Sequence, residues 1–147
     1  EEFARRVVAE IRKHGMAERT MIQSFDWSTL QVVQKIAPEI RTMYLSSPRT
    51  LKAESATKPS PWLAGFEPES RGGTVPKAVK AAGGKIWAPN QTYLTPELLA
   101  EAHALGLLVI PWTVNDPAMM AKLLDMGVDG IISDRPDVVK AELGKRK

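Results

Sequence analysis

Apolar residues recur along the chain with two alternating periods, one typical of helices and one typical of buried strands. Near the start, Phe3, Val7 and Ile11 are spaced as on one face of a helix, and Gly15 follows them. Glycine readily adopts the left-handed conformation in which many helices end, so we predict that this helix stops there. The next apolar run, residues 21–25 (MIQSF), has the length of a short buried strand.

The unit of helix, stop signal and strand then repeats. A second helix carries Leu30, Val33 and Ile36 on one face and ends before Pro38. Proline at a first helical position and glycine just beyond a last one mark the later helices. The predicted strands are residues 21–25, 42–46, 85–89, 107–114 and 130–134, and the later helices run from about Val75 to Ala82, Thr95 to Gly106, Asp116 to Gly127 and onward from about Pro136.

Regular alternation of strands and helices predicts an α/β fold with a parallel sheet of about five strands. A doubly wound sheet and a (β/α)8 barrel share this pattern, and the short repeat from one stop glycine to the next favours the barrel by a small margin. A complete barrel needs about 250 residues. The 147 residues of this chain therefore supply about half of one.

One connection departs from the pattern. Residues 47–74 are rich in proline, serine and glycine and are too long for an ordinary loop. They follow a predicted strand, and the loops after strands form the active-site face of a barrel. We interpret them as a loop or lid inserted into the single half-barrel domain of residues 1–147, with Trp62 (in SPWLAGF) as the candidate contact residue. A mobile loop without a contact role is the alternative.

Composition narrows the class of protein. With 44% hydrophobic and 25% charged residues, the chain has the make-up of an ordinary globular domain. The absence of cysteine excludes disulfides, thiolate metal sites and a cysteine nucleophile. The basic clusters behind the net charge of +3 lack interleaved aromatic residues, so nucleic acid is not an expected partner. No apolar run has the length of a membrane span, and nothing chooses between a cytoplasmic and a periplasmic location.

Three aspartates, Asp26, Asp116 and Asp134, lie at the ends of predicted strands, where a barrel enzyme places metal ligands. Each also precedes a helix, and we interpret all three as helix caps. The two histidines, His14 and His103, lie in predicted helices, away from the strand ends. The residues themselves therefore indicate neither a catalytic centre nor a metal site in this chain.

Four segments resemble a known family. The strand end PWTVND (residues 111–116) and the segment MGVDGIISDRPD (126–137) resemble the C-terminal signature of glycerophosphodiester phosphodiesterases. QSFDW (23–27) resembles a strand in the middle of the family's barrel, and EAHALGLLVIPW (101–112) resembles its penultimate helix and strand. The resemblance implies that this chain is the C-terminal half of a (β/α)8 TIM-type barrel of the phospholipase-C-like phosphodiesterase kind.

The resemblance also implies an activity. The family hydrolyses a glycerophosphodiester to glycerol 3-phosphate and an alcohol, with one divalent cation, calcium or magnesium, and two histidines as acid and base. Its N-terminal half carries a His-Arg-Gly strand, a Glu-x-Asp pair, a second histidine before an aspartate and a Glu-x-Lys strand, none of which this sequence contains. We therefore expect the missing half to bind the cation and the 147-residue chain to be inactive alone.

By the same resemblance, this half supplies the wall that contacts the substrate. Trp112, Phe25 and Trp62 are expected to make apolar contacts with the glycerol or the alcohol moiety. Ser24 and Asn115 are expected to offer hydrogen bonds, and Asn115 is also able to cap the helix that follows it. Packing of Trp112 in the barrel core is the alternative.

Two other interpretations stay open. The chain could be a non-catalytic half-barrel that serves as an assembly or interaction module, because open strand edges invite pairing with a missing half or with a second chain. A different barrel enzyme, such as an aldolase, would need a lysine or a catalytic carboxylate at a strand end. Lys85, in contrast, lies at the beginning of a predicted strand.

Overall fold

The structure, a computed structural model, describes residues 1–55 and 58–146. Strands and helices alternate along the chain, as the hydrophobic pattern predicts. The strands are β1 (Met21–Ser24), β2 (Arg41–Ser46), β3 (Ile86–Pro89) and β4 (Leu108–Val109), and the α-helices are α1 (Glu2–Lys13), α2 (Trp27–Ile36), α3 (Pro48–Leu51), α4 (Val75–Ala81), α5 (Pro96–Ala104), α6 (Pro117–Met126) and α7 (Pro136–Gly144). Short 3-10 helices lie at Ala17–Arg19, Pro68–Arg71 and Gln91–Tyr93.

The order of the strands distinguishes the two architectures that the sequence leaves open. All neighbouring strands pair in parallel, and the order across the sheet is β1-β2-β3-β4, the same as along the chain. A doubly wound sheet reverses its strand order at one point and carries helices on both faces. Sequential parallel order is the arrangement of a (β/α)8 barrel, in which each strand lies beside the next.

The two faces of the sheet carry different side chains. On one face, Tyr44, Trp87 and Val109 are fully buried against residues of the helices. On the other face, a separate apolar cluster comes from the strands and the extended segments that continue them or run beside them. Its buried members are Met43, Leu45, Ile86 and Ala88, and partly buried Met21, Phe25, Ile110, Trp112 and Ile132 pack against them. The helices thus cover one face, and the second cluster lies where the interior of a barrel would be.

The last two predicted strands are less regular than expected. Of residues 107–114, only β4 is regular strand, and residues 130–134 run beside it without strand geometry. They are still hydrogen-bonded to their neighbour: the amide of Ile132 donates to the carbonyl of Pro111 at 3.0 Å, and the amide of Val114 donates to the carbonyl of Ile132 at 2.9 Å. Pro111 has no N–H to donate, so the ladder of hydrogen bonds cannot be regular at this position.

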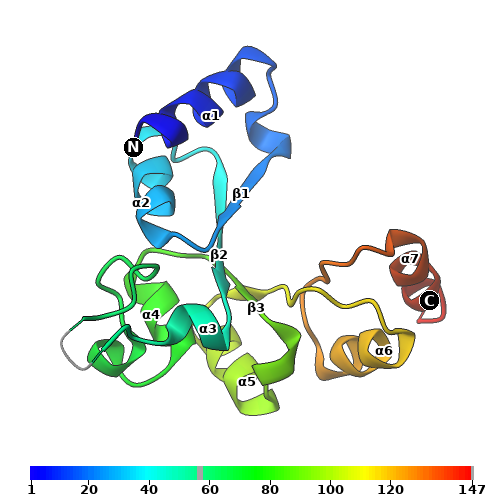
Figure 1. Cartoon of the computed structure of the whole chain (residues 1–147). Helices are drawn as coiled ribbons and strands as arrows, with labels where there is room; N and C mark the ends of the chain where they lie inside the picture. Colours follow the sequence, from blue (N-terminus) through cyan, green and yellow to red (C-terminus); the bar gives the residue numbers. More distant parts are fainter. Residues whose placement is uncertain (56–57, 147) are drawn as a thin grey trace.

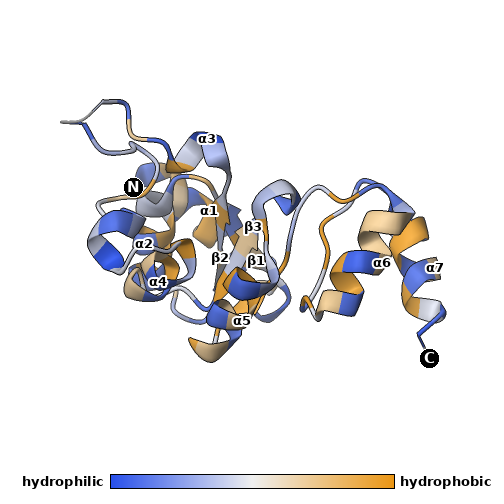
Figure 2. Cartoon of the chain, turned by 90° about the horizontal axis from the view of Figure 1, so that it is seen from below, coloured by the Kyte–Doolittle hydropathy of each residue, from blue (hydrophilic) through white to orange (hydrophobic). Residues whose placement is uncertain are grey.

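Pairs of neighbouring helices lie toward both ends of the molecule. Figure 1 shows α1 beside α2 near β1, and α6 beside α7 at the other end of the molecule, near the C-terminus. Figure 2 shows that hydrophobic segments gather where the helices meet the sheet and where α6 faces α7. Among the helices in the described ranges, none has both the length and the hydrophobicity that crossing a lipid bilayer requires.

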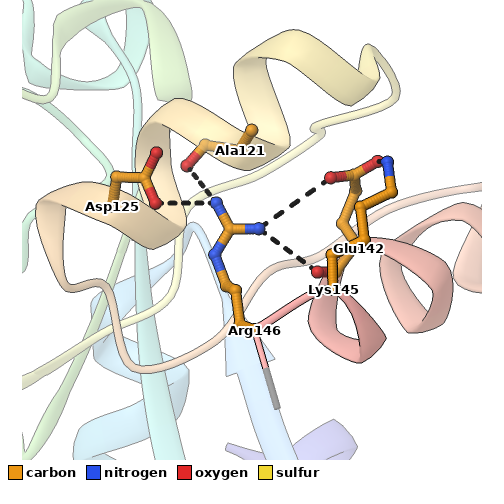
Figure 3. Close-up of polar contacts among 5 residues, drawn as sticks. All are labelled: Ala121, Asp125, Glu142, Lys145 and Arg146. Atoms are coloured by element: carbon orange, nitrogen blue, oxygen red, sulfur yellow. Dashed lines mark hydrogen bonds and ion pairs between the residues drawn. The ribbon is translucent and has the colours of Figure 1, made fainter.

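A polar clamp joins α7 to α6. The guanidinium of Arg146, just beyond α7, donates to the carbonyl of Ala121 at 2.9 Å and pairs with the carboxylate of Asp125 at 2.8 Å (Figure 3). It also donates to the carbonyl of Glu142 at 3.2 Å. The Glu142 side chain is buried and pairs with Lys145 as well. Arg146 therefore connects the end of the chain to the middle of α6.

We predict that Arg146→Ala lowers the free energy of unfolding by about 1 kcal/mol, because two backbone hydrogen bonds and the ion pairs with Asp125 and Glu142 are lost. Urea denaturation of the two proteins measures the difference. Lys122→Ala is the matched control, since Lys122 is an exposed cation on α6 outside the clamp. Equal destabilisation by both substitutions would contradict this role of Arg146.

Candidate functional site

A pocket of about 370 Å³ lies at the carboxyl ends of the strands. Phe25 directly follows β1, Ser47 directly follows β2, and Trp112 lies on the extended segment beyond β4. In a barrel, this end of the strands carries the active site, because every loop that follows a strand opens there. The residues that line the pocket are Phe25, Ser47, Arg49, Thr50, Trp62 and Trp112.

Two aromatic rings from separate strand ends meet in this pocket. Phe25 and Trp112 pack edge to face, with ring centroids 5.3 Å apart and an interplanar angle of 81°. The indole N–H of Trp112 donates to the carbonyl of Ala88 at 2.8 Å, so the polar atom of the ring is bound to the protein. Trp112 is only partly buried and belongs to the cluster on the barrel-interior face. Its ring therefore points away from the helix layer and presents apolar surface to the pocket.

The third aromatic residue comes from the long 47–74 segment, which is anchored to the core. Leu63 is fully buried, and the carbonyl of Trp62 accepts a hydrogen bond from the amide of Trp27 at 2.9 Å. The hydroxyl of Ser60 donates to the carbonyl of Thr50 at 2.6 Å and accepts from the amide of Trp62 at 3.2 Å. The Trp62 side chain nevertheless keeps 43% of its surface exposed. Its backbone is thus fixed while its indole remains accessible at the pocket.

The remaining lining residues belong to α3, the short helix that follows β2. Ser47 caps this helix: its hydroxyl accepts from the amide of Thr50 at 3.2 Å, and the Thr50 hydroxyl accepts from the amide of Ser47 at 2.9 Å. Arg49 lies between them and is exposed. Arg49 was not predicted as a site residue from the sequence. The available signal was a cation three residues after a strand, at the start of a long loop.

Ser24 and Asn115, which were predicted to contact substrate, are not among the residues that line the pocket. The Ser24 hydroxyl accepts a hydrogen bond from the amide of Asp26 at 3.0 Å. Asn115 holds the segment after β4 against residues 133–134: its side-chain oxygen accepts from the amide of Asp134 at 2.9 Å, and its nitrogen donates to the Asp134 carboxylate at 2.9 Å. Asn115 does not cap the following helix, because Asp116 does.

The predicted helix caps are confirmed at two of the three aspartates. The Asp26 carboxylate accepts from the amide of Ser28 at 2.9 Å, and the Asp116 carboxylate accepts from the amide of Met119 at 3.0 Å. For Asp134 the prediction is wrong: Pro136 occupies the first turn of α7, the capping position falls on Arg135, and Asp134 binds Asn115 instead.

The helix cap also affects the ionisation of Asp26. Partial burial tends to raise the pKa of Asp26, but hydrogen bonds donated by Ser28 and Thr29 outweigh it and hold that pKa below its usual value. The Asp26 carboxylate is therefore ionised at neutral pH, and its oxygens accept hydrogen bonds from the first turn of α2. Within the described residues, no three side chains of histidine, cysteine, aspartate or glutamate converge as a cation would require.

Both histidines lie away from the pocket. His103, on α5, is 2.9 Å from the carboxylate of Asp129, which also accepts from the amide of Val109 at 2.7 Å. His14, at the end of α1, lies 3.5 Å from the carboxylate of Glu10. Neither histidine lines the pocket, so neither is placed for proton transfer there.

Three hydrogen-bonded side chains, those of Ser46, Trp87 and Tyr93, hold the end of β2 next to the pocket. The indole N–H of Trp87 donates to the hydroxyl of Ser46 at 2.8 Å, and that hydroxyl also bonds the phenol of Tyr93. Burial raises the pKa of Tyr93 above its ordinary value, so the phenol stays neutral. Ser46 is fully buried and directly precedes Ser47 of the pocket. This group therefore fixes the end of β2 at the point where the pocket wall begins.

Comparison with known proteins gives consistent results. The model of the glycerophosphoryl diester phosphodiesterase family matches residues 2–138. A solved structure from Silicibacter pomeroyi, named for the same activity, is 36% identical, with a TM-score of 0.81 over 99% of this chain and 44% of that one. A glycerophosphodiester phosphodiesterase from Caldanaerobacter subterraneus is 25% identical over 91% of this chain and 46% of its own length.

More distant structures share the fold. A phosphodiesterase from Oleispira antarctica, solved in complex with its product sn-glycerol-3-phosphate, has a TM-score of 0.61 and 20% identity over 84% of this chain and 41% of its own. These neighbours confirm the predicted half of a TIM-type barrel. The chain spans about half the length of the relatives that it matches. With a family match that extends over nearly all of its residues, the chain belongs to the glycerophosphoryl diester phosphodiesterase family.

Proposed function

We propose that this chain forms the substrate-binding wall of an enzyme that hydrolyses glycerophosphodiesters to glycerol 3-phosphate and an alcohol. The pocket at the carboxyl ends of the strands carries the proposal, since it brings Phe25, Trp62 and Trp112 together. Such a mostly apolar concave site suits the carbon skeleton of glycerol or of an alcohol moiety. The glycerol 3-phosphate bound to the Oleispira antarctica protein is consistent with this substrate class.

Hydrolysis of a phosphodiester requires catalytic groups in addition to a surface that binds the substrate. The charge on the phosphate oxygens must be neutralised, the nucleophile deprotonated and the leaving oxygen protonated. The aspartates and histidines among the described residues of this chain do not fit a divalent cation site, since they are engaged in helix caps or in pairs outside the pocket. We propose that an N-terminal half-barrel supplies the proton-transfer histidines and the ligands for calcium or magnesium.

Within the wall, we assign apolar contact with the substrate to the edge-to-face pair of Phe25 and Trp112. Trp62 would close over the pocket from the 47–74 segment, because its indole is accessible while its backbone is held by the core. The hydrogen bonds expected from Ser24 and Asn115 to substrate stay a prediction. Both side chains already bond to neighbouring residues of the protein.

The test uses residues 1–147 joined to an N-terminal half-barrel, either the natural upstream sequence or the corresponding half of the Silicibacter pomeroyi relative. We call this protein the assembled barrel. Trp112→Ala should reduce its rate of glycerol 3-phosphate release by about 10- to 100-fold, because the Phe25 ring and the substrate both lose an apolar partner.

Leu108→Ala is the matched control, since Leu108 is a large apolar residue at the opposite end of the sheet with 47% of its surface exposed. It should leave the rate within about twofold. An unchanged rate in the Trp112 variant would refute the role of this residue. A folded assembled barrel that releases no glycerol 3-phosphate from any glycerophosphodiester would refute the proposed function itself.

A further inference from the structure

Most polar groups of the pocket are already satisfied by the protein. The Trp112 indole N–H is bonded to Ala88, and the hydroxyls of Ser47 and Thr50 bond to each other's backbone amides. Among the six described residues that line the pocket, Arg49 alone is charged. It has no hydrogen bond or ion pair to any residue in the described ranges. The pocket is therefore lined by aromatic side chains and by one arginine whose guanidinium has no partner among the described residues.

Some arginines of the chain are paired with acidic side chains, whereas Arg19 and Arg41, like Arg49, have no hydrogen bond or ion pair to a described residue; Arg49 differs from these two in lining a pocket with three aromatic side chains. Arg12 pairs with Glu39 at 2.7 Å and Arg146 pairs with Asp125 at 2.8 Å, so each helps to join two helices or their flanking segments. A guanidinium offers five N–H donors in a planar fork that matches a carboxylate or a phosphate. An unpaired arginine that lines a pocket together with three aromatic side chains is consequently suited to an anionic group that arrives with an organic ligand.

We propose that Arg49 binds an anionic substituent on the alcohol moiety, so that the enzyme prefers glycerophosphodiesters whose alcohol carries a second phosphate or a carboxylate. This inference rests on the proposed function, which places neutralisation of the reacting phosphate in the N-terminal half. Arg49 lines the same pocket as Trp62, Phe25 and Trp112. We therefore assign Arg49 as a specificity-determining residue that contacts the alcohol moiety, the part of the substrate released as the alcohol product.

The test compares two ligands that differ by a single phosphate, glycerophosphoinositol and glycerophosphoinositol 4-phosphate. In the assembled barrel, Arg49→Gln should lower kcat/KM for the phosphorylated compound by about 10-fold, because charge-assisted hydrogen bonds are lost. The value for glycerophosphoinositol should change by less than about twofold. Lys52→Gln is the matched control, since it removes the same charge from an exposed residue of the same loop outside the pocket.

Three outcomes of this kinetic comparison would overturn the inference. An equal loss with both compounds would mean that Arg49 contacts the reacting phosphate. An unchanged rate with both would mean that Arg49 contacts neither, and an equal effect of Lys52→Gln would mean that only the general charge of the loop matters. Arg49→Lys should keep part of the preference, because a lysine retains the charge without the planar fork.

Direct binding separates this inference from the proposed function. Tryptophan fluorescence of residues 1–147, titrated with the same two compounds, should show tighter binding of the phosphorylated one, and Arg49→Gln should abolish the difference. Equal binding of both compounds by the unsubstituted chain overturns the inference even if the assembled barrel is active. A preference that depends on Arg49, together with no turnover by the assembled barrel, would instead count against the proposed reaction alone.

Discussion

Residues 1–147 alone are expected to release no glycerol 3-phosphate from glycerophosphocholine, with calcium or with magnesium present. Proton transfer by positioned side chains is typically worth about 10²- to 10⁴-fold in rate, and a metal ion contributes further stabilisation of the reacting phosphate. In the described part of the chain, neither histidine reaches the pocket and no set of carboxylates forms a cation site. Aromatic contacts bind substrate but cannot replace these groups.

Supplying the N-terminal half, covalently or as a second polypeptide, should restore turnover. The physical reason is the inner apolar cluster, whose partly buried members include Ile110, Trp112 and Ile132 and which the second half of a barrel would cover. The control is the N-terminal half alone, with the same cations.

Metal-dependent turnover by residues 1–147 would contradict the prediction, and Asp26, Asp116 and Asp134 would then be the first residues to replace. A chain that forms stable oligomers in size-exclusion chromatography, and gains no activity from the other half, would support the assembly module instead.

Trp87→Ala should lower the free energy of unfolding by about 3–5 kcal/mol, the cost typical of removing a large aromatic side chain from a core. Trp87 is fully buried, packs in the main core and donates to the hydroxyl of Ser46. Its loss would leave a cavity and remove one of the two partners of that hydroxyl, with Tyr93 as the other. Because stabilities of small domains are about 5–15 kcal/mol, this loss is a large fraction of the total.

The matched control is the same substitution at an exposed site. Trp62 keeps 43% of its surface accessible, so Trp62→Ala should cost less than about 1 kcal/mol, although it alters the pocket. Urea denaturation, followed by circular dichroism so that tryptophan loss does not affect the signal, measures both variants. Similar shifts of the two midpoints would contradict the assignment of Trp87 to the core.

Much of the fold follows from local signals in the sequence. Helix ends are predictable where the residue type favours the backbone conformation of a helix end. Gly127 ends α6 with a φ of 94°, and Asp116 caps the start of the same helix before Pro117. The same rule explains the error at Asp134, because a proline at position 136 places the cap on Arg135. The strand predicted for residues 107–114 is longer than β4. Its apolar residues indicate a strand, but Pro111 lacks the amide hydrogen that a regular strand needs at this position.

The site was predictable only in part. Phe25 and Trp112 lie at the ends of strands, and the carboxyl ends of parallel strands share one edge, so their proximity follows from topology. Trp62 joins them through the backbone bond to Trp27, a contact between distant segments that composition does not reveal. Arg49 was not predicted as a site residue. It stands out in the structure because it lines the pocket without a partner among the described residues, and the lack of a partner depends on where every acidic side chain lies in the fold.

The sequential order of the strands has a consequence for how the chain folds. Each strand pairs with the one that comes next in the sequence, so β1 finds β2, β2 finds β3 and β3 finds β4 across a single intervening connection. Pairing between near neighbours in the sequence lowers the entropy lost on closing loops and favours faster folding. The sheet can therefore grow one strand at a time as the polypeptide leaves the ribosome. The longest connection, from the end of β2 at Ser46 to the start of β3 at Ile86, is expected to close most slowly, because the entropy lost on closing a loop rises with its length.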